Sequence, residues 1–415
     1  MKRITDLLLL LTICIGCTPQ QALEGKLIVE EKVDHLGSLA REPMLAEHPN
    51  GDLYVTGYMN ATESPQLWKS TDDGRNWTSV DVGTKDQGAD GNSDVDLVID
   101  EEGNIYFLTM RYTTFPEDTT GFDWSSIKGE HIAVGISRDE GSNWEWTYLS
   151  QNDYDDRPWI EIASDGSAHV IWNDGKGVHY ASSNDRGKSW SERRTIYPKG
   201  GSSHLAAGPD GKLAVRVSPL SASGFVFDEG LDLILLSMDY GATWEEVQLP
   251  GEREWSSEFG QGTPRWVEPI SWDEKGSLYY LWSEGRQLNL SVSDNNGKDW
   301  KTFPVTSSEK LIYYPYLTVD NDKISCTWLS GKGNEITHHA GIIIIQGEQA
   351  YLSELEPQTL TDIKLRRGSE DLGHGGEYFP IKSLSNGGYG MVTSIQNEYD
   401  DRFGFTWWKL ARTEK

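Results

Sequence analysis

The strongest constraint on the fold is an eight-residue phrase, Ser-x-Asx-x-Gly-x-x-Trp, that occurs five times along the chain. The copies begin at Ser70, Ser137, Ser183, Ser237 and Ser293, and successive starts lie 46 to 67 residues apart. A phrase that returns at this spacing indicates repeated structural units. Within it, Ser and Asx bond to their own backbone, Gly permits a positive φ, and Trp buries a large apolar face. We therefore expect each copy to form a stiff hairpin turn. A calcium loop, the competing interpretation, needs more oxygen ligands than this turn offers.

A second repeated signal indicates seven units rather than five. It is a tight turn followed by an apolar run rich in β-branched and aromatic residues, which is typical of a β-hairpin. The seven turns are Asn50-Gly51, Glu102-Gly103, Asp165-Gly166, Asp210-Gly211, Lys275-Gly276, Asn321-Asp322 and Asn386-Gly387. One strand is expected on each side of the turn and one on each side of the eight-residue phrase. Each unit is therefore predicted to contain four strands.

The two ends of the chain are expected to share the last unit. The sixth unit lacks the phrase but keeps a third strand at 341–345, and the seventh ends at 403–410 without a fourth strand. A spare strand at 26–33 is available near the N-terminus. If it completes the last sheet, the units close into a ring and protect their edges, which is the arrangement of a β-propeller. We predict an all-β fold, a single propeller of seven blades, with six blades as the alternative.

The first 24 residues are predicted to be a targeting segment followed by a tether. Lys2 and Arg3 precede an apolar run at 7–15 that is too short to span a bilayer. Cys17 follows in a pattern that resembles a bacterial lipoprotein signal. We predict a signal peptide at 1–16, lipidation of Cys17, a tether at 17–24 and the propeller at 25–415. The alternative is an ordinary secretory signal. The protein is expected in the bacterial cell envelope, lipid-anchored on the periplasmic or outer surface, or secreted.

The net charge and the cysteine content limit the classes of partner and cofactor that the protein is expected to bind. The formal net charge is −28 and no basic stripe is present, which argues against a nucleic-acid partner. After export only Cys17 and Cys326 remain, so lipid on Cys17 leaves no disulfide within the chain. The sequence has no Cys-rich metal spacing, phosphate loop or nucleotide fingerprint. We predict a monomer without metal or cofactor, whose membrane contact is the lipid anchor alone.

The chemistry is expected where the innermost strands of the propeller begin, around one mouth of its central channel. These starts carry charged and aromatic residues that plain structural strands do not need. They are Arg41-Glu42-Pro43, Ser93-Asp94-Val95-Asp96, Asp155-Asp156-Arg157-Pro158-Trp159, Ser202-Ser203-His204, Arg265-Trp266-Val267-Glu268-Pro269, Tyr313-Tyr314-Pro315-Tyr316 and Glu377-Tyr378-Phe379-Pro380. Five of the seven hold a proline at the matching place, which marks equivalent positions. Such a ring forms either a carbohydrate or carboxylate site or a set of ion pairs that locks neighbouring blades.

The eight-residue phrase resembles the Asp box of the sialidase-like (BNR-repeat) superfamily, and the resemblance covers nearly all of 25–415. That superfamily includes sialidases, other glycosidases, lyases and non-catalytic proteins. Arg41-Glu42-Pro43 is similar to the sialidase Arg-x-Pro, whose arginine binds the substrate carboxylate. Glu268 and Tyr314 are similar to the sialidase base and nucleophile. The resemblance implies an exported, exo-sialidase-like glycoside hydrolase acting on a glycan that contains sialic or uronic acid.

The resemblance is incomplete in three respects. No residue between the Arg-x-Pro and the first Asp box matches the acid/base Asp of sialidases convincingly, and no arginine lies between Arg286 and Tyr314 to complete the arginine triad. Sialidases also have six blades. Asp94 is therefore a catalytic candidate from a neighbouring blade, beside Tyr314 and Glu268. The substrate-binding candidates are Arg41, Arg157, Arg265, Arg286, His204 and Tyr378.

Two functions of other classes stay open. A lyase on uronic-acid polymers would use His204 or Tyr378 to abstract the proton alpha to the carboxylate, while an arginine neutralises that carboxylate. A non-catalytic surface propeller would use the same face to hold a glycan or a protein partner. Turnover of an aryl glycoside, formation of an unsaturated sugar, or binding without turnover distinguishes the three.

Overall fold

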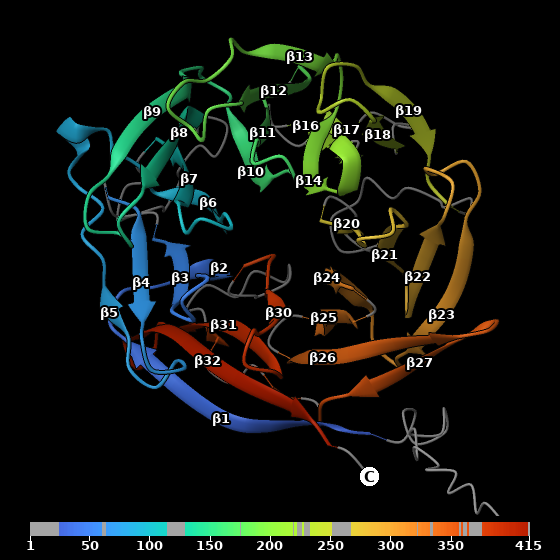
Figure 1. The fold of residues 1–415 in the computed structure, drawn as a ribbon. Coiled ribbons are helices and arrows are strands. Elements are labelled where there is room, and N and C mark those ends of the chain that lie inside the picture. The colour runs from blue at the N-terminus through green and yellow to red at the C-terminus, as the bar shows by residue number, and fades with distance from the viewer. Residues whose placement is uncertain are drawn as a thin grey trace, which may run out of the picture.

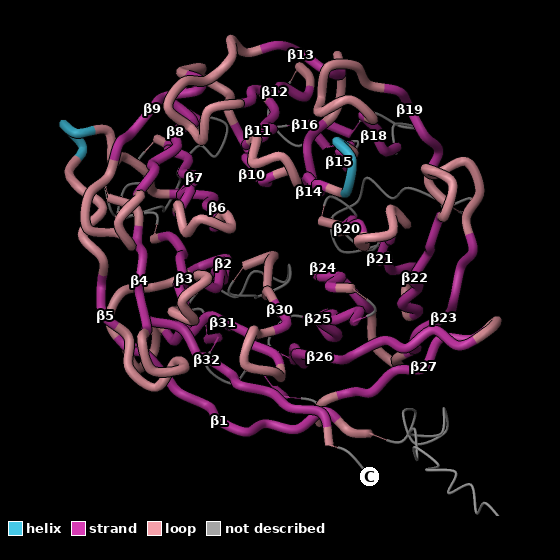
Figure 2. Tube along the Cα trace, viewed as in Figure 1, coloured by secondary structure: helices cyan, strands magenta, loops and turns pink. Residues whose placement is uncertain are grey.

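The computed structural model describes residues 25–59, 64–113, 129–174, 176–218, 220–221, 226–227, 233–250, 267–321, 323–332, 335–356, 358–359, 363–364 and 376–413. Seven of the β-sheets that these residues form are arranged as blades around a common axis (Figure 1). The described helices are two single 3-10 turns, η1 (Lys85–Gln87) and η3 (Pro209–Gly211), which stand out among the strands in Figure 2. The predicted all-β, seven-bladed propeller is confirmed.

Within each blade the strands are antiparallel neighbours, numbered in chain order from the axis outward except in the last blade. Blade 1 consists of β2 (Arg41–Glu47), β3 (Leu53–Tyr58), β4 (Gln66–Ser70) and β5 (Thr78–Ser79). Blade 2 consists of β6 (Ser93–Ile99), β7 (Ile105–Tyr112), β8 (Gly129–Ser137) and β9 (Glu145–Ser150). Blade 3 consists of β10 (Asp156–Ile162), β11 (Ala168–Asn173), β12 (Val178–Ser183) and β13 (Arg194–Tyr197). Blade 4 consists of β14 (Gly201–Ala207), β15 (Leu213–Ser218), β18 (Leu233–Ser237) and β19 (Glu245–Gln248), with a small hairpin of β16 (Leu220–Ser221) and β17 (Val226–Phe227).

The remaining three blades complete the ring. Blade 5 consists of β20 (Ile270–Trp272), β21 (Leu278–Glu284), β22 (Gln287–Ser293) and β23 (Lys301–Ser307). Blade 6 consists of β24 (Ile312–Asp320), β25 (Lys323–Lys332), β26 (Glu335–Gln346) and β27 (Gln349–Glu354), with β28 (Gln358–Thr359) beside β26. Blade 7 consists of β30 (Ile381–Ser383), β31 (Tyr389–Asn397), β32 (Arg402–Arg412) and β1 (Leu27–Leu36), with β29 (Ile363–Lys364) parallel to β31.

The N-terminal strand closes the ring. β1 pairs antiparallel with β32, from Leu27 opposite Arg412 to Leu36 opposite Gly404. The start of β1 also makes a parallel bridge to Leu355 of blade 6. The first and last described strands therefore lie in one sheet, as Figure 1 shows for the blue β1 and the red β32. The prediction that an N-terminal strand completes the last blade is confirmed.

All five repeated phrases form the turn between the third and fourth strands of a blade. In the first, the Ser70 Oγ accepts a hydrogen bond from the Gly74 N–H at 2.9 Å, and the Asp72 Oδ1 accepts one from the Asn76 N–H at 2.8 Å. A Cβ on Gly74 (φ +85°) would lie 2.1 Å from the Trp407 Nε1 of blade 7. The glycine is therefore needed for both the turn and the close approach of the neighbouring blade.

The aspartate of the phrase acts as a hydrogen-bond acceptor, and the fifth copy performs that task with Asn295, whose Oδ1 accepts from the Asp299 N–H at 2.9 Å. We predict that Asp72→Ala lowers the free energy of unfolding by about 1 kcal/mol, and that Asp72→Asn lowers it by less than about half as much. Urea titration followed by tryptophan fluorescence measures both variants. Equal losses in the two variants would contradict the acceptor role.

The core lies between successive blades, where large side chains from neighbouring sheets interlock. Trp172, Trp328 and Trp407 are fully buried, and Cys326 is a buried free thiol in β25. Among the described residues, no helix has the length and hydropathy needed to cross a bilayer.

Candidate functional site

The innermost strands of five blades begin with the same irregularity. Each carries one residue more than its partner strand, at Arg41/Met44, Ser93/Val95, Asp156/Trp159, Ser202/His204 and Tyr313/Tyr316. Such β-bulges re-aim side chains and are over-represented beside active sites. The bulges hold Glu42, Asp94, Arg157 and Tyr314. The antiparallel pairing places them on the rim opposite the Asp-box turns.

Three of the bulged residues have a left-handed backbone. The φ angles are +46° at Glu42, +51° at Arg157 and +49° at Tyr314, and each of these residues precedes a proline. Residues before proline normally adopt extended conformations, and non-glycine residues rarely adopt positive φ. Equivalent strain in three blades is the kind of feature that concentrates at functional sites. The prolines that mark equivalent positions in the sequence thus mark a shared backbone geometry.

Charged groups from four blades meet at this mouth. The Arg157 Nη2 lies 3.8 Å from the Glu377 Oε2, and the Arg157 Nε lies 3.7 Å from the Asp156 Oδ2. The Arg41 Nε lies 3.9 Å from the Glu42 Oε1, which also accepts a hydrogen bond from the Glu377 backbone N–H at 3.2 Å. We call this group the mouth cluster: Arg41, Glu42, Asp94, Asp156, Arg157 and Glu377, with the phenols of Tyr58, Tyr112, Tyr314 and Tyr378.

Three carboxyl groups of the mouth cluster, those of Glu42, Asp94 and Asp156, have raised pKa values. Burial raises the pKa of Glu42 to about 8, and repulsion from Asp94 adds to the shift. Burial also raises the pKa of Asp156 to about 6, against the pull of Arg157. The pKa of Asp94 is raised by burial as well, with Arg157 and Arg41 opposing. At neutral pH the cluster is therefore less negative than its composition implies.

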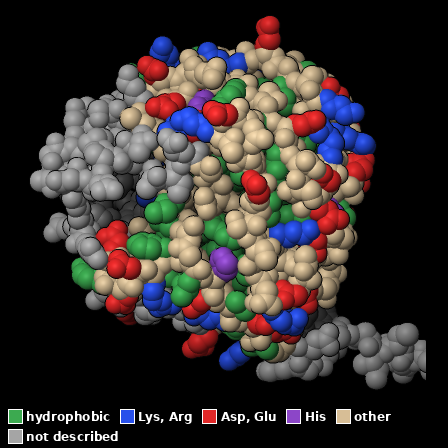
Figure 3. All heavy atoms as spheres, turned by 90° about the vertical axis from the view of Figure 1, so that its left-hand side faces the viewer, with side chains coloured by type: hydrophobic (Ala, Val, Ile, Leu, Met, Phe, Trp, Pro, Cys, Tyr) green, Lys and Arg blue, Asp and Glu red, His purple; other side chains and the backbone are tan. Residues whose placement is uncertain are grey.

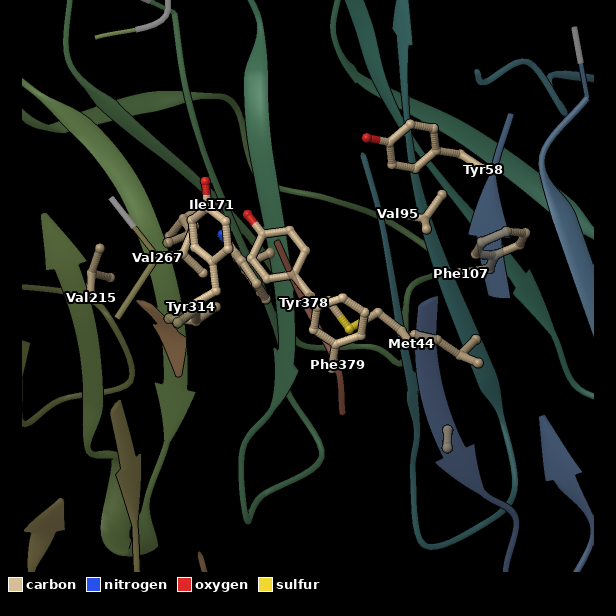
Figure 4. Packing of buried hydrophobic residues seen from close by; sticks show 14 of the residues in the cluster. Met44, Tyr58, Val95, Phe107, Ile171, Val215, Val267, Tyr314, Tyr378 and Phe379 are labelled. Carbon is tan, nitrogen blue, oxygen red and sulfur yellow. The ribbon is translucent and has the colours of Figure 1, made fainter. Parts of the chain in front are cut away.

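Two phenols of the cluster are buried beside these charges. Tyr314 is 1% exposed and Tyr378 is 4% exposed. Burial raises the pKa of each phenol well above its usual value, Glu377 raises it further, and Arg157 opposes the shift. In Figure 4 the hydroxyl groups of Tyr314 and Tyr378 point the same way, and that of Tyr58 points toward them from blade 1. Tyr314 is thus a neutral phenol on which Glu377 is the principal negative influence.

Aromatic rings pack next to the charged groups. His204 stacks on Trp159 at 4.1 Å between ring centroids, and Tyr378 meets Trp159 edge-on at 5.0 Å. His204 is 5% exposed, and within the described part of the chain its Nε2 is buried without a hydrogen-bond partner. Burial lowers the pKa of His204 to about 3, with the Arg216 charge contributing. His204 is therefore a neutral imidazole at any physiological pH.

The predicted base Glu268 lies in a buried ion pair between blades 4 and 5. Its Oε2 is 3.2 Å from the Arg216 Nη2 and accepts a hydrogen bond from the Tyr280 hydroxyl. Its backbone N–H donates to the Ser203 Oγ at 3.1 Å. The side chains of Glu268 and Arg216 are both fully buried. The carboxylate with the largest electrostatic effect on Tyr314 is instead Glu377. The pairing of Tyr314 with Glu268 stays a prediction.

The other predicted site residues fall into two groups. The structure brings Arg41, Asp94, Arg157, Tyr314 and Tyr378 together in the mouth cluster, with His204 beside Trp159 in the adjoining aromatic layer. Arg286 is exposed in the turn between β21 and β22, and Arg265 and Cys17 lie outside the described residues.

The sequence analysis did not select six contributors: Glu42, Asp156, Glu377, Arg216, Tyr58 and Tyr112. The first three occur within the strand starts given above, each directly beside a predicted site residue. That position in the sequence was the only signal that could have indicated them. Arg216 carried a separate signal, because it is a charge inside the otherwise apolar strand β15. In the described part of the chain, no group of three or more His, Cys, Asp and Glu side chains is arranged to hold a metal ion.

The described residues of blades 1 and 2 show no extended field of positive charge on the outer surface. Figure 3 shows Lys and Arg side chains there scattered among Asp and Glu rather than gathered into a stripe. This face therefore matches the acidic composition and offers no electropositive track for phosphate groups.

Comparison with known proteins identifies the fold. No protein-family model and no curated protein matches the chain. Among solved structures, an ulvan lyase bound to a GlcA-Rha3S fragment matches with a TM-score of 0.55 and 12% identity, over 92% of this chain and 96% of the lyase. YCF48 bound to a D1 peptide matches with a TM-score of 0.52 and 13% identity, over 95% and 99%. A microbial sialidase matches with a TM-score of 0.46 and 15% identity, over 70% of this chain and 63% of the sialidase.

The chain is a seven-bladed β-propeller. Its solved neighbours include an ulvan lyase and a peptide-bound YCF48, and at 12% and 13% identity this likeness shows the fold alone. Because one propeller fold hosts unrelated functions, the function has to be argued from the mouth cluster itself.

Proposed function

We propose that the protein is a glycoside hydrolase that acts at the mouth cluster on a glycan bearing a sugar carboxylate. The observation that carries the proposal is that two arginines, four carboxyl groups and the Tyr314 phenol converge from five blades, and that Glu42, Arg157 and Tyr314 do so on strained backbone bulges. A purely structural ring of ion pairs would not need a phenol held by a left-handed bulge beside a carboxylate.

Arg41 and Arg157 are the groups proposed to bind the sugar carboxylate. Guanidinium groups bind carboxylates through paired, charge-assisted hydrogen bonds, which fix the orientation of the sugar ring. Both arginines feel the charges of Glu377 and Asp94, so their guanidinium groups approach the same small region. The Arg41 side chain is 35% exposed and can be reached from solvent.

Tyr314 is the proposed nucleophile and Glu377 its proposed base. The phenol stays protonated at neutral pH, so attack on the anomeric carbon requires transfer of its proton, here to Glu377. Asp94 donates a proton to the leaving oxygen as the glycosidic bond breaks. In the second half-reaction Asp94 takes a proton from water, which displaces Tyr314 and releases the sugar with retained configuration. Glu377 then returns the proton to Tyr314.

Release of an aryl reporter tests the proposal. We expect turnover of an aryl sialoside or an aryl glucuronide, and no comparable turnover of the aryl glucoside, which lacks the carboxylate. Turnover of the glucoside alone would overturn the carboxylate specificity. Saturable glycan binding without any turnover would instead establish the non-catalytic alternative.

A lyase on uronic-acid polymers is the second candidate. One observation favours it: the neutral His204 ring and the Tyr378 phenol lie 6.2 Å apart between ring centroids, close to Arg157. A neutral imidazole can accept the proton alpha to a carboxylate that an arginine neutralises. An ulvan lyase also shares the fold. New ultraviolet absorbance from an unsaturated sugar would establish this reaction, and its absence across a panel of uronans would exclude it.

We also propose that the protein is exported and anchored through lipid on Cys17. β1 starts on the rim opposite the mouth, because it runs toward the start of β2. An anchor ahead of β1 would leave the mouth cluster facing away from the membrane, where a large glycan can reach it. Labelling with radioactive palmitate, lost in Cys17→Ser, tests the anchor.

A further inference from the structure

Glu42 occupies the place where a ligand carboxylate would be expected. Its Oε1 lies 3.9 Å from the Arg41 Nε and accepts a hydrogen bond from the backbone N–H of Glu377 at 3.2 Å. A guanidinium beside a backbone N–H is a general carboxylate-binding arrangement. The Glu42 side chain is only 6% exposed, and its bulged backbone (φ +46°) directs it there. The protein's own carboxyl group thus fills the arrangement that the proposed function requires for a sugar acid.

The position of the Glu42 carboxyl group beside Arg41 affects how strongly the mouth cluster can bind an acidic ligand. The mouth cluster holds two guanidinium groups, Arg41 and Arg157, against the four carboxyl groups of Glu42, Asp94, Asp156 and Glu377. A fifth carboxylate brought by a ligand would meet net repulsion if all four were ionised. Protonation of Glu42 removes one negative charge and ends its attraction for Arg41, so that Arg41 can bind the ligand.

We propose that Glu42 is a specificity-determining residue, whose carboxyl group lies where the substrate carboxylate would bind and which yields Arg41 to an acidic sugar only when it is protonated. This inference rests on the proposed function, because it concerns the same carboxylate site. It adds a condition that neither the fold nor the Asp-box resemblance implies: acidic sugars bind together with a proton on Glu42, whereas neutral sugars do not depend on it.

The groups that face Glu42 define the pH range. They are Arg41 and Tyr58 from blade 1, Asp94 from blade 2 and Glu377 from blade 7. With its pKa raised to about 8, Glu42 is protonated below that pH in the free protein. The affinity for an acidic sugar is therefore flat below about pH 8 and falls up to about tenfold per pH unit above it, until the pKa of the bound form is reached. Burial raises the pKa of the Tyr58 phenol well above its usual value. Asp156, with its pKa raised to about 6, titrates below this range, and burial raises the pKa of Asp94 as well.

Calorimetric titration of the whole protein tests the proposal. The probes are D-glucuronate and N-acetylneuraminate, with D-glucose as the neutral counterpart, between about pH 6 and about pH 10. The variants are Glu42→Gln, which keeps an acceptor for the Glu377 N–H but cannot ionise, and Glu47→Gln as a control. Glu47 is at the far end of β2, where it bonds to Ser385. Thermal melting verifies that both variants are folded.

The expected result is that the wild-type protein and Glu47→Gln lose affinity for the acidic probe above about pH 8, while Glu42→Gln keeps its neutral-pH affinity across the range. Binding of an acidic probe that is independent of pH in the wild-type protein would overturn the role of Glu42 but leave the proposed function intact. The same holds if Glu42→Gln weakens as steeply as the wild type. Failure of both proteins to bind either acidic probe would overturn the proposed function together with the inference.

Discussion

Replacing Tyr314 by phenylalanine is expected to reduce kcat for release of the aryl reporter at least about a thousandfold. The change removes only the hydroxyl that is proposed to attack the anomeric carbon. The ring is 1% exposed and packs edge-on against Tyr313 at 5.3 Å between centroids, and phenylalanine keeps that packing. KM and the melting temperature should therefore change little. Steady-state kinetics and thermal melting measure the three quantities.

Tyr313 provides a matched control for this prediction. It precedes Tyr314 in the same strand, it is equally buried, and its hydroxyl has no hydrogen-bond partner among the described residues. Tyr313→Phe should therefore leave kcat within about threefold of the wild-type value, because it removes a phenol that has no proposed role in the reaction. Full activity of Tyr314→Phe would refute the nucleophile assignment. Equal losses in the two variants would show that the loss comes from disturbed packing.

Replacing Arg216 by methionine is expected to lower the free energy of unfolding by about 3–5 kcal/mol. Arg216 and Glu268 are both fully buried, and their ion pair joins β15 of blade 4 to the start of blade 5. Methionine approximates the length of the arginine stem but leaves the Glu268 carboxylate buried without its cation. Urea denaturation at neutral pH measures the loss.

The double variant Arg216→Met, Glu268→Gln separates the lost charge pair from lost packing. Because the neutral amide removes the uncompensated charge, we expect the double variant to recover about half or more of the lost stability. It also tests Glu268 as a catalytic base. If the folded double variant retains reporter release, then Glu268 is structural. If Glu268→Gln alone abolishes turnover without a stability loss, the base assigned from the sialidase resemblance is correct and Glu377 is not the base.

The fold was predictable because a propeller repeats its signals in the sequence. Seven turn-and-strand patterns indicated the number of blades, although only five units carry the Asp box. The box stabilises one outer turn of a blade and is not needed in every sheet. The completion of the last blade by the N-terminal strand was predictable for a similar reason. The last unit has only three strands, and a spare strand occurs near residue 26. Pairing the spare strand with the last unit closes the ring and leaves no open sheet edge.

The site was predictable only in part, because the relevant contacts join different blades. The polar strand starts predicted a site at one mouth, and the structure places Arg41, Asp94, Arg157, Tyr314 and Tyr378 near one another there. The partner of each residue could not be predicted. Glu268 precedes a proline, as Glu42 does. Glu268, however, pairs with Arg216, which lies on the second strand of blade 4. The proximity of Glu377 to Arg157 depends on closure of the ring, which brings blade 7 beside the first blades.

A crystal structure of the protein soaked with N-acetylneuraminate or D-glucuronate tests the central claim most directly. We predict that the sugar carboxylate lies within hydrogen-bond distance of the Arg41 and Arg157 guanidinium groups, with the anomeric carbon facing the Tyr314 hydroxyl and the Glu42 side chain withdrawn from Arg41. A sugar bound elsewhere on the propeller, or a mouth cluster that keeps all its internal ion pairs at saturating ligand, would contradict the account.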